Sequence, residues 1–187
     1  MHWMTRFLKS FRRNDEGTVM TEALIVLPLL IWAFMAMFVY WDAFRSVNVS
    51  QKAAYNISDL LSRQAEVDNR FLDGMQSILT YMTPPEQNAR IRMTSVQYVA
   101  ADDRYIVLWS RSPGAAMTAL DDTSVQLSSF KDRIPLMSDG HSVVIVETEM
   151  DYDPPFEAGI GARVMEEFVV TRPRFYRRIC MISGCPV

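Results

Sequence analysis

The chain has 187 residues, a formal net charge of −3 and only two cysteines. This length suits one membrane anchor and one modest domain, and the mildly acidic balance excludes a general nucleic-acid binder. The charge is unevenly distributed, because residues 1–17 carry a net +2 and the remainder of the chain carries −5.

Residues 1–17 have the composition of a basic leader that precedes a long apolar run. Basic and apolar side chains are interleaved within it, which favours contact with an anionic membrane surface. The first charged residues beyond the run, Asp42 and Arg45, balance each other. The positive-inside rule therefore predicts a cytoplasmic N-terminus and an extracytoplasmic domain over residues 42–187.

The apolar run, residues 23–41, contains 19 residues without a charge. As a helix it would be about 28 Å long, close to the roughly 30 Å hydrocarbon core of a bilayer. We therefore predict one transmembrane helix over residues 18–41. A secretory signal peptide has a shorter apolar core that small residues follow, whereas this run ends in Tyr40 and Trp41, which are typical anchors at a membrane interface.

Pro28 lies inside the predicted span, where it removes one backbone hydrogen bond of the helix. It is either a functional helix kink or a proline that neighbouring groups tolerate within the membrane. Ala33 and Ala36 give one face of the helix small side chains, which suits either packing against another helix or plain exposure to lipid.

Glu22 stands at the mouth of the apolar run, five residues after Gly17, in the sequence Gly-Thr-Val-Met-Thr-Glu. An ionisable group at a membrane edge needs a partner or a function. In one interpretation Gly17 simply begins the helix, and Glu22 is a first-turn acid favoured by the helix dipole. In the other, cleavage after Gly17 leaves a cationic amine on Thr18. Glu22, one turn further on, then neutralises this amine or that of a neighbouring subunit.

A basic leader, a glycine, a glutamate five residues later and then Ala-Leu-Ile-Val-Leu-Pro-Leu-Leu make up a recognisable pattern. The pattern resembles the processing site of type IV pilin-like proteins, and residues 16–45 look most like the TadE/TadF-like pseudopilins of the tight-adherence pilus. The resemblance implies that a prepilin peptidase cuts between Gly17 and Thr18, which makes Glu22 the fifth residue of the mature chain. Residues 143–156 and 169–175 show a less specific similarity to the same family.

The resemblance implies assembly without catalysis, by a minor pilin-like subunit that crosses the bacterial inner membrane once and places its domain in the periplasm. It does not separate TadE from TadF, nor a subunit built into the pilus from one that only primes assembly. Its expected partners are the prepilin peptidase, other pilin and pseudopilin subunits, the pilus assembly platform and membrane lipid. No nucleic acid, small-molecule substrate or cofactor is expected. The alternative is a single-pass, membrane-anchored periplasmic binding or sensing protein that keeps its leader.

Beyond the span, helical patterns come first and alternating patterns follow. The first helix extends to about residue 63, and its apolar stripe is expected to pack on a sheet: Val47, Ala53, Ala54, Ile57, Leu60 and Leu61. A turn at residues 66–69 leads to a second helix over residues 70–82. Strands are expected at residues 89–99, 104–109, 142–149 and 164–171, with a short helix near residues 125–133. This order predicts an α+β fold, in which a small antiparallel sheet packs on the long N-terminal helix.

Few residues beyond the leader suggest chemistry. Asp139, His141 and Ser142 are crowded into one turn, where the geometry of a catalytic triad is rare. Asp151 and Asp153, near Glu149, offer oxygen ligands for a cation, but their loop lacks the glycine and the further acids of a calcium site. We therefore expect no catalytic residues and no metal site.

The C-terminal segment contains both cysteines, Cys180 and Cys185, with four residues between them. In an oxidising compartment they either close a short disulfide loop or remain free thiols. His141 is the one histidine outside the leader, so the four ligands of a zinc site are not available.

Overall fold

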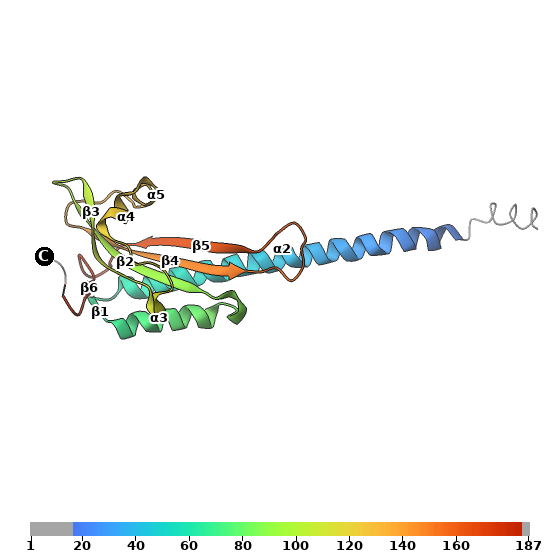
Figure 1. The fold of residues 1–187 in the computed structure, drawn as a ribbon, viewed down its shortest axis with the longest axis horizontal. Helices are drawn as coiled ribbons and strands as arrows, with labels where there is room; N and C mark the ends of the chain where they lie inside the picture. Colours follow the sequence, from blue (N-terminus) through green and yellow to red (C-terminus); the bar gives the residue numbers. More distant parts are fainter. Residues whose placement is uncertain (1–16, 185–187) are drawn as a thin grey trace, which may run out of the picture.

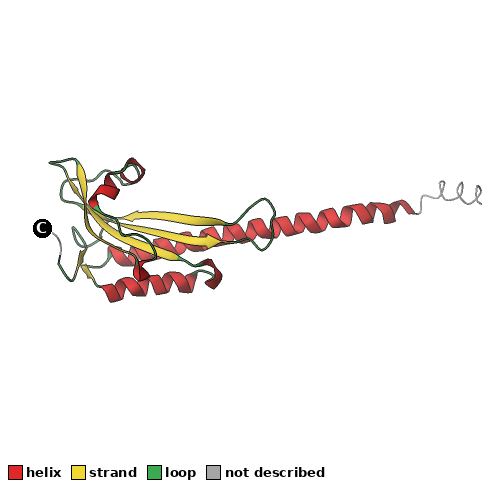
Figure 2. Ribbon diagram, viewed as in Figure 1, coloured by secondary structure: helices red, strands yellow, loops and turns green. Residues whose placement is uncertain are grey.

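The computed structural model describes residues 17–184 and shows a long helix that emerges from a small α+β domain (Figure 1). The helix, α2 (Thr18–Ser62), is exposed over residues 19–34 and packs on a β-sheet over its C-terminal half (Figure 2). The predicted fold class, a long apolar helix continuing into a domain with a small antiparallel sheet, is confirmed.

The C-terminal half of α2 packs on the sheet through the expected apolar stripe, with one exception. Ala53, Ala54, Ile57 and Leu61 are fully buried, because residues three and four apart share one face of a helix. Leu60 is 39% exposed, so its assignment to the stripe was wrong, since it lies beyond the edge of that face. Small buried side chains allow α2 to lie close to the strands: Ser46, Ser50, Ser58 and Ser62.

The second helix, α3 (Asn69–Met82), lies beside α2 on the same face of the sheet. It begins at Asp68, whose carboxylate accepts a hydrogen bond from the Phe71 N–H at 2.7 Å. It ends at Thr83, as expected of a residue that precedes a proline.

The segment between these helices is not only a turn, as the sequence predicted. Two of its residues form β1 (Glu66–Val67), which pairs in parallel with β6 (Cys180–Met181). A two-residue pairing with the far end of the chain has no local sequence pattern, so the expectation of a plain turn was wrong at this point.

Four antiparallel strands form the main sheet, in the order β3-β2-β4-β5. They are β2 (Arg90–Val99), β3 (Arg104–Arg111), β4 (Ser142–Tyr152) and β5 (Arg163–Thr171). β2 and β3 form the expected hairpin. β4 continues past its expected end at residue 149, because Asp151 and Tyr152 pair with Val164 and Arg163 of β5.

The sheet carries an apolar core on each face. One core lies against α2 and α3 and includes Ile57, Leu72 and Ile91. The other core includes Val125 and Ile145 and is covered by α4 (Asp122–Gln126) and α5 (Ser128–Lys131). These two short helices replace the single helix expected near residues 125–133, because Leu127 between them has an extended backbone. The 3-10 turns η2 (Pro85–Gln87) and η3 (Pro113–Ala115) complete the domain.

Candidate functional site

Gly17 directly precedes α2, and the structure gives no steric reason for glycine there. Its φ of −83° and ψ of −10° are close to helical values. A Cβ built on Gly17 would meet no atom of the described chain within 4 Å. The Gly17 carbonyl accepts a hydrogen bond from Thr21 Oγ1 at 3.4 Å, which any residue could accept. A larger side chain would therefore fit this backbone.

Glu22 lies on the exposed surface of α2, one helical turn after Thr18. Within residues 17–184, no basic side chain forms an ion pair with its carboxylate. The residues that follow it are exposed and apolar, so its surroundings along the helix offer little to stabilise a charge. Pairing of Glu22 with an N-terminal amine stays a prediction.

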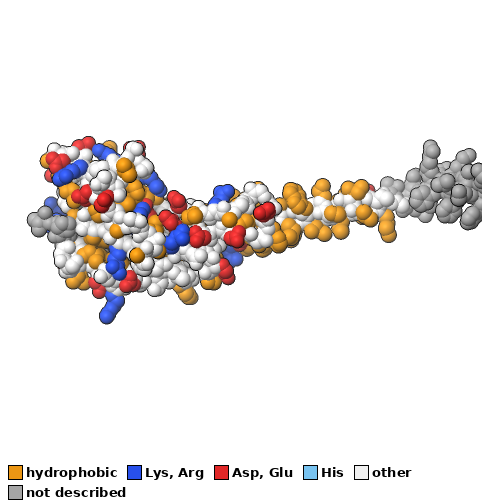
Figure 3. Space-filling view, viewed as in Figure 1, with side chains coloured by type: hydrophobic (Ala, Val, Ile, Leu, Met, Phe, Trp, Pro, Cys, Tyr) orange, Lys and Arg blue, Asp and Glu red, His pale blue; other side chains and the backbone are white. Residues whose placement is uncertain are grey.

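The N-terminal half of α2 is an exposed apolar surface. Only 6% of the residues in its most apolar stretch are buried, and the helix is long and apolar enough to span a membrane. Figure 3 shows hydrophobic side chains along this part of the helix, whereas charged side chains gather on the domain. The helix is continuous through Pro28, and a functional kink there stays a prediction.

The junction between the exposed helix and the domain is held by Tyr152, the last residue of β4. Its side chain is 1% exposed, and its hydroxyl donates to Asp42 Oδ2 at 3.2 Å. The Val39 carbonyl lies 3.5 Å from the same hydroxyl. Burial, followed by the nearby Asp42 carboxylate, raises the pKa of Tyr152 to about 12. Tyr152 thus joins the sheet to the point where α2 leaves the domain.

Tyr152→Phe is expected to lower the free energy of unfolding by about 1–2 kcal/mol, because it deletes a partly buried hydrogen bond to a carboxylate. The Tyr152 pKa is higher in the folded chain than the value of about 10 expected in the unfolded chain. The stabilisation is therefore complete below about pH 10 and is lost as the pH rises toward 12. Unfolding of both full-length proteins in detergent, followed across this range, checks the prediction. A difference that stays constant from pH 8 to about pH 12 would contradict it.

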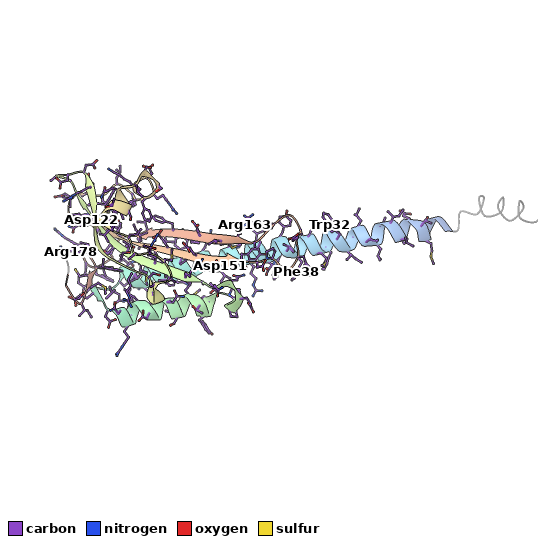
Figure 4. The ribbon with its side chains drawn as sticks, viewed as in Figure 1. Trp32, Phe38, Asp122, Asp151, Arg163 and Arg178 are labelled. Carbon is purple, nitrogen blue, oxygen red and sulfur yellow. The ribbon has the colours of Figure 1, made fainter. Side chains whose placement is uncertain are left out.

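The loop between β4 and β5, residues 153–162, returns along α2 toward its N-terminus. Phe156 and Ala158 line a surface groove together with Trp32 and Met35 of the helix. Figure 4 places Trp32 and Phe38 on the stretch of α2 beside this loop, and Asp151 and Arg163 where the loop leaves the sheet. From the sequence, this segment was expected to follow the end of a strand, and Asp153 was considered only as an oxygen ligand for a cation. A phenylalanine directly after two prolines was the signal that the sequence offered for this contact.

Gly159 fixes the loop against the helix. Its φ of +91° is a conformation that L-residues rarely adopt, and a Cβ there would lie 3.3 Å from the Tyr40 hydroxyl. Ile160, the next residue, packs against the cluster of Ala43, Met150 and Tyr152. The loop is therefore attached to α2 and does not project freely from the sheet.

The residues considered for catalysis have structural partners. The Asp139 carboxylate accepts a hydrogen bond from the Ala100 N–H at 2.9 Å, and the Ser142 hydroxyl donates to the Arg177 carbonyl at 2.8 Å. The backbone N–H of His141 donates to the Ser138 carbonyl. These contacts link the start of β4 to its neighbouring loops.

Two of the three carboxylates considered for a metal, Glu149 and Asp151, are paired with arginine. Arg90 Nη2 lies 3.3 Å from Glu149 and 2.9 Å from Asp151. Two residues further along β2, Arg92 donates two hydrogen bonds of 2.7 and 2.8 Å to Glu147 on β4. Within the described part of the chain, no group of three or more His, Cys, Asp or Glu residues could hold a metal ion.

The C-terminal segment returns to the C-terminal end of α2. The backbone N–H of Arg174 donates to the Ser62 carbonyl at 2.8 Å, and its guanidinium lies 2.5 Å from Asp59. Cys180, in β6, is disulfide-bonded. Cys185, the other cysteine of the sequence, lies outside the described residues.

The chain was compared with known proteins, and no family model, curated protein or solved structure matches it.

Proposed function

We propose that this chain is a minor pilin-like subunit of the TadE/TadF-like kind, which a prepilin peptidase matures by cleavage between Gly17 and Thr18. The observation that carries the proposal is the start of α2. Gly17 has an ordinary backbone conformation and open space around it, so the fold does not require glycine there. A glycine at this position is explained if a protease recognises a residue without a side chain at its cleavage site.

Glu22 supports the same proposal. Its carboxylate has no cationic partner within residues 17–184, although it precedes an apolar helix surface. Cleavage after Gly17 would create a cationic amine on Thr18, one turn away. Under this proposal, cleavage supplies a positive charge for Glu22, which no described side chain of residues 17–184 provides.

The division of α2 into an exposed apolar half and a packed half agrees with a subunit that acts by assembly. The exposed half would lie in the inner membrane and then among the helices of neighbouring subunits, where small and apolar side chains suit close packing. The domain would face the periplasm and contact the assembly platform and other pilin subunits. Under this proposal the protein turns over no substrate.

The predicted cleavage is tested by measuring the intact mass and the N-terminal sequence of the protein from native membranes. The membranes come from strains with and without the candidate prepilin peptidase. The mature chain is expected to begin at Thr18 only when the peptidase is present. A chain that keeps its leader in both strains would contradict the proposal and favour a single-pass binding or sensing protein. A start within residues 23–41 would instead indicate a secretory signal peptide.

A further inference from the structure

The loop of residues 153–162 lies beside a part of α2 that the sequence analysis placed inside the membrane. Phe156 and Ala158 share a groove with Trp32, whereas Gly159 lies against Tyr40. Tyr40 lies eight positions after Trp32, which corresponds to about 12 Å along a helix axis. If the hydrocarbon core extended to Trp41, the part of the loop that lies against these helix residues, residues 156–159, would have to lie within it.

The backbone of this loop cannot be accommodated in hydrocarbon. Pro154 and Pro155 have no N–H, but the other eight residues each carry one. No hydrogen bond joins the backbone of residues 153–162 to another backbone group of residues 17–184. Each backbone group that is left unpaired in lipid costs several kcal/mol, so the loop must lie where water reaches it.

The side chains around the loop are those of a membrane interface. Phe156 is 44% exposed, and the loop contains two acidic residues and no basic one. Exposed aromatic side chains gather on α2 at the same level: Trp32, Phe34, Phe38, Tyr40, Trp41 and Phe44. Aromatic residues concentrate where a span meets the headgroups. The exposed apolar helix continues directly from this zone, which makes the bilayer the favoured partner over a second protein.

We propose that the loop of residues 153–162 lies in the headgroup region of the outer leaflet, with the exposed part of Phe156 against lipid, and that it sets the depth at which the domain sits on the membrane. The hydrocarbon boundary is then near Trp32 and not at Trp41. The part of α2 within the hydrocarbon, residues 18–32, spans only about 22 Å. This inference rests on the membrane anchoring in the proposed function but not on cleavage after Gly17.

Spin labels attached to single engineered cysteines in the full-length protein test this placement in vesicles of phosphatidylethanolamine with a minority of phosphatidylglycerol. Phe156→Cys reports on the loop, and Ala158→Cys repeats the measurement without removing the phenylalanine. Leu24→Cys reports on the exposed helix, and Leu136→Cys on an exposed site before the start of β4, at the opposite end of that strand. The unsubstituted protein, treated with the label without reductant, gives the background from the native cysteines.

The ratio of collisions with oxygen to collisions with a water-soluble nickel complex reports the depth of each label. The two loop labels are expected to show ratios several-fold above that at residue 136 and below that at residue 24. If the loop labels are as accessible to nickel as the label at residue 136, while the label at residue 24 is buried in lipid, the inference about the loop is overturned. The membrane anchoring of the helix would still stand. A water-accessible label at residue 24 would instead refute the anchoring itself. Protection of the loop that disappears when the protein is diluted in lipid would mean that a second copy covers it, which also overturns the inference.

Discussion

Replacing Gly17 with phenylalanine is expected to abolish maturation while leaving the fold unchanged. The backbone at Gly17 is nearly helical, and no atom of the described chain lies within 4 Å of the position of its Cβ. The phenylalanine side chain can therefore project from the start of α2 without displacing a neighbour. A peptidase that encloses the scissile bond has no such space, so the processed fraction should fall to background in N-terminal sequencing of membrane protein.

Gly74 provides a matched control for this substitution. It also has no positive φ and no atom within 4 Å of its Cβ position, but it lies in α3, far from the cleavage site in the sequence. Gly74→Phe should therefore be processed as the unsubstituted protein is. Gly17→Ala adds a single carbon and should retain more processing than Gly17→Phe. Normal processing of Gly17→Phe would show that Gly17 is not a recognition residue.

The regular elements of the fold could be predicted because their patterns are local. The helix α2 follows from a run without glycine after residue 17, and α3 from its apolar spacing and from the prolines after Thr83. The strands β2 and β4 follow from alternation and from β-branched residues. In each case the residues that determine the element lie within it or next to it.

The features that the sequence analysis missed depend on contacts between distant segments. β1 exists because Glu66 and Val67 meet Cys180 and Met181, and β4 is longer than expected because β5 continues to pair with it. A pairing partner extends a strand beyond the residues whose own preferences favour it. Leu60 was assigned to the wrong face because its spacing placed it near the edge of the stripe, where only the packed sheet decides burial.

In the candidate site, too, some residues could be identified from local sequence and others only from contacts between distant segments. Gly17 and Glu22 could be identified from their spacing, because the sequence itself carries that motif. The Tyr152 hydroxyl and Asp42, which meet at 3.2 Å, are 110 residues apart. The contact of the loop of residues 153–162 with Trp32 likewise exists only once β4 and β5 have brought the loop back to α2. The junction at Tyr152 and the position of the loop beside α2 therefore depend on tertiary contacts that no local sequence pattern records.

Under the proposed function, the largest effect on assembly is expected from Glu22. Insertion of a subunit among its neighbours would bury the Glu22 carboxylate, and the structure provides no internal cation for it within residues 17–184. Its partner must then come from the new N-terminal amine of the same subunit or of a neighbour. Removing one member of a buried ion pair costs roughly 3–5 kcal/mol, which is more than about a hundredfold in an equilibrium constant.

Glu22→Ala and Glu22→Gln are both expected to be cleaved after Gly17 and to lower the number of pili by more than about tenfold, since each leaves the Thr18 amine without its counter-charge. Glutamine preserves the length and polarity of the side chain, so it separates the need for charge from the need for shape. Glu22→Asp keeps the charge on a side chain one carbon shorter and should restore part of the assembly. Electron microscopy of surface pili measures the number, and N-terminal sequencing of the same membranes confirms that cleavage persists. Normal pilus numbers in Glu22→Gln would refute pairing with the amine, because a neutral amide cannot replace the carboxylate in an ion pair.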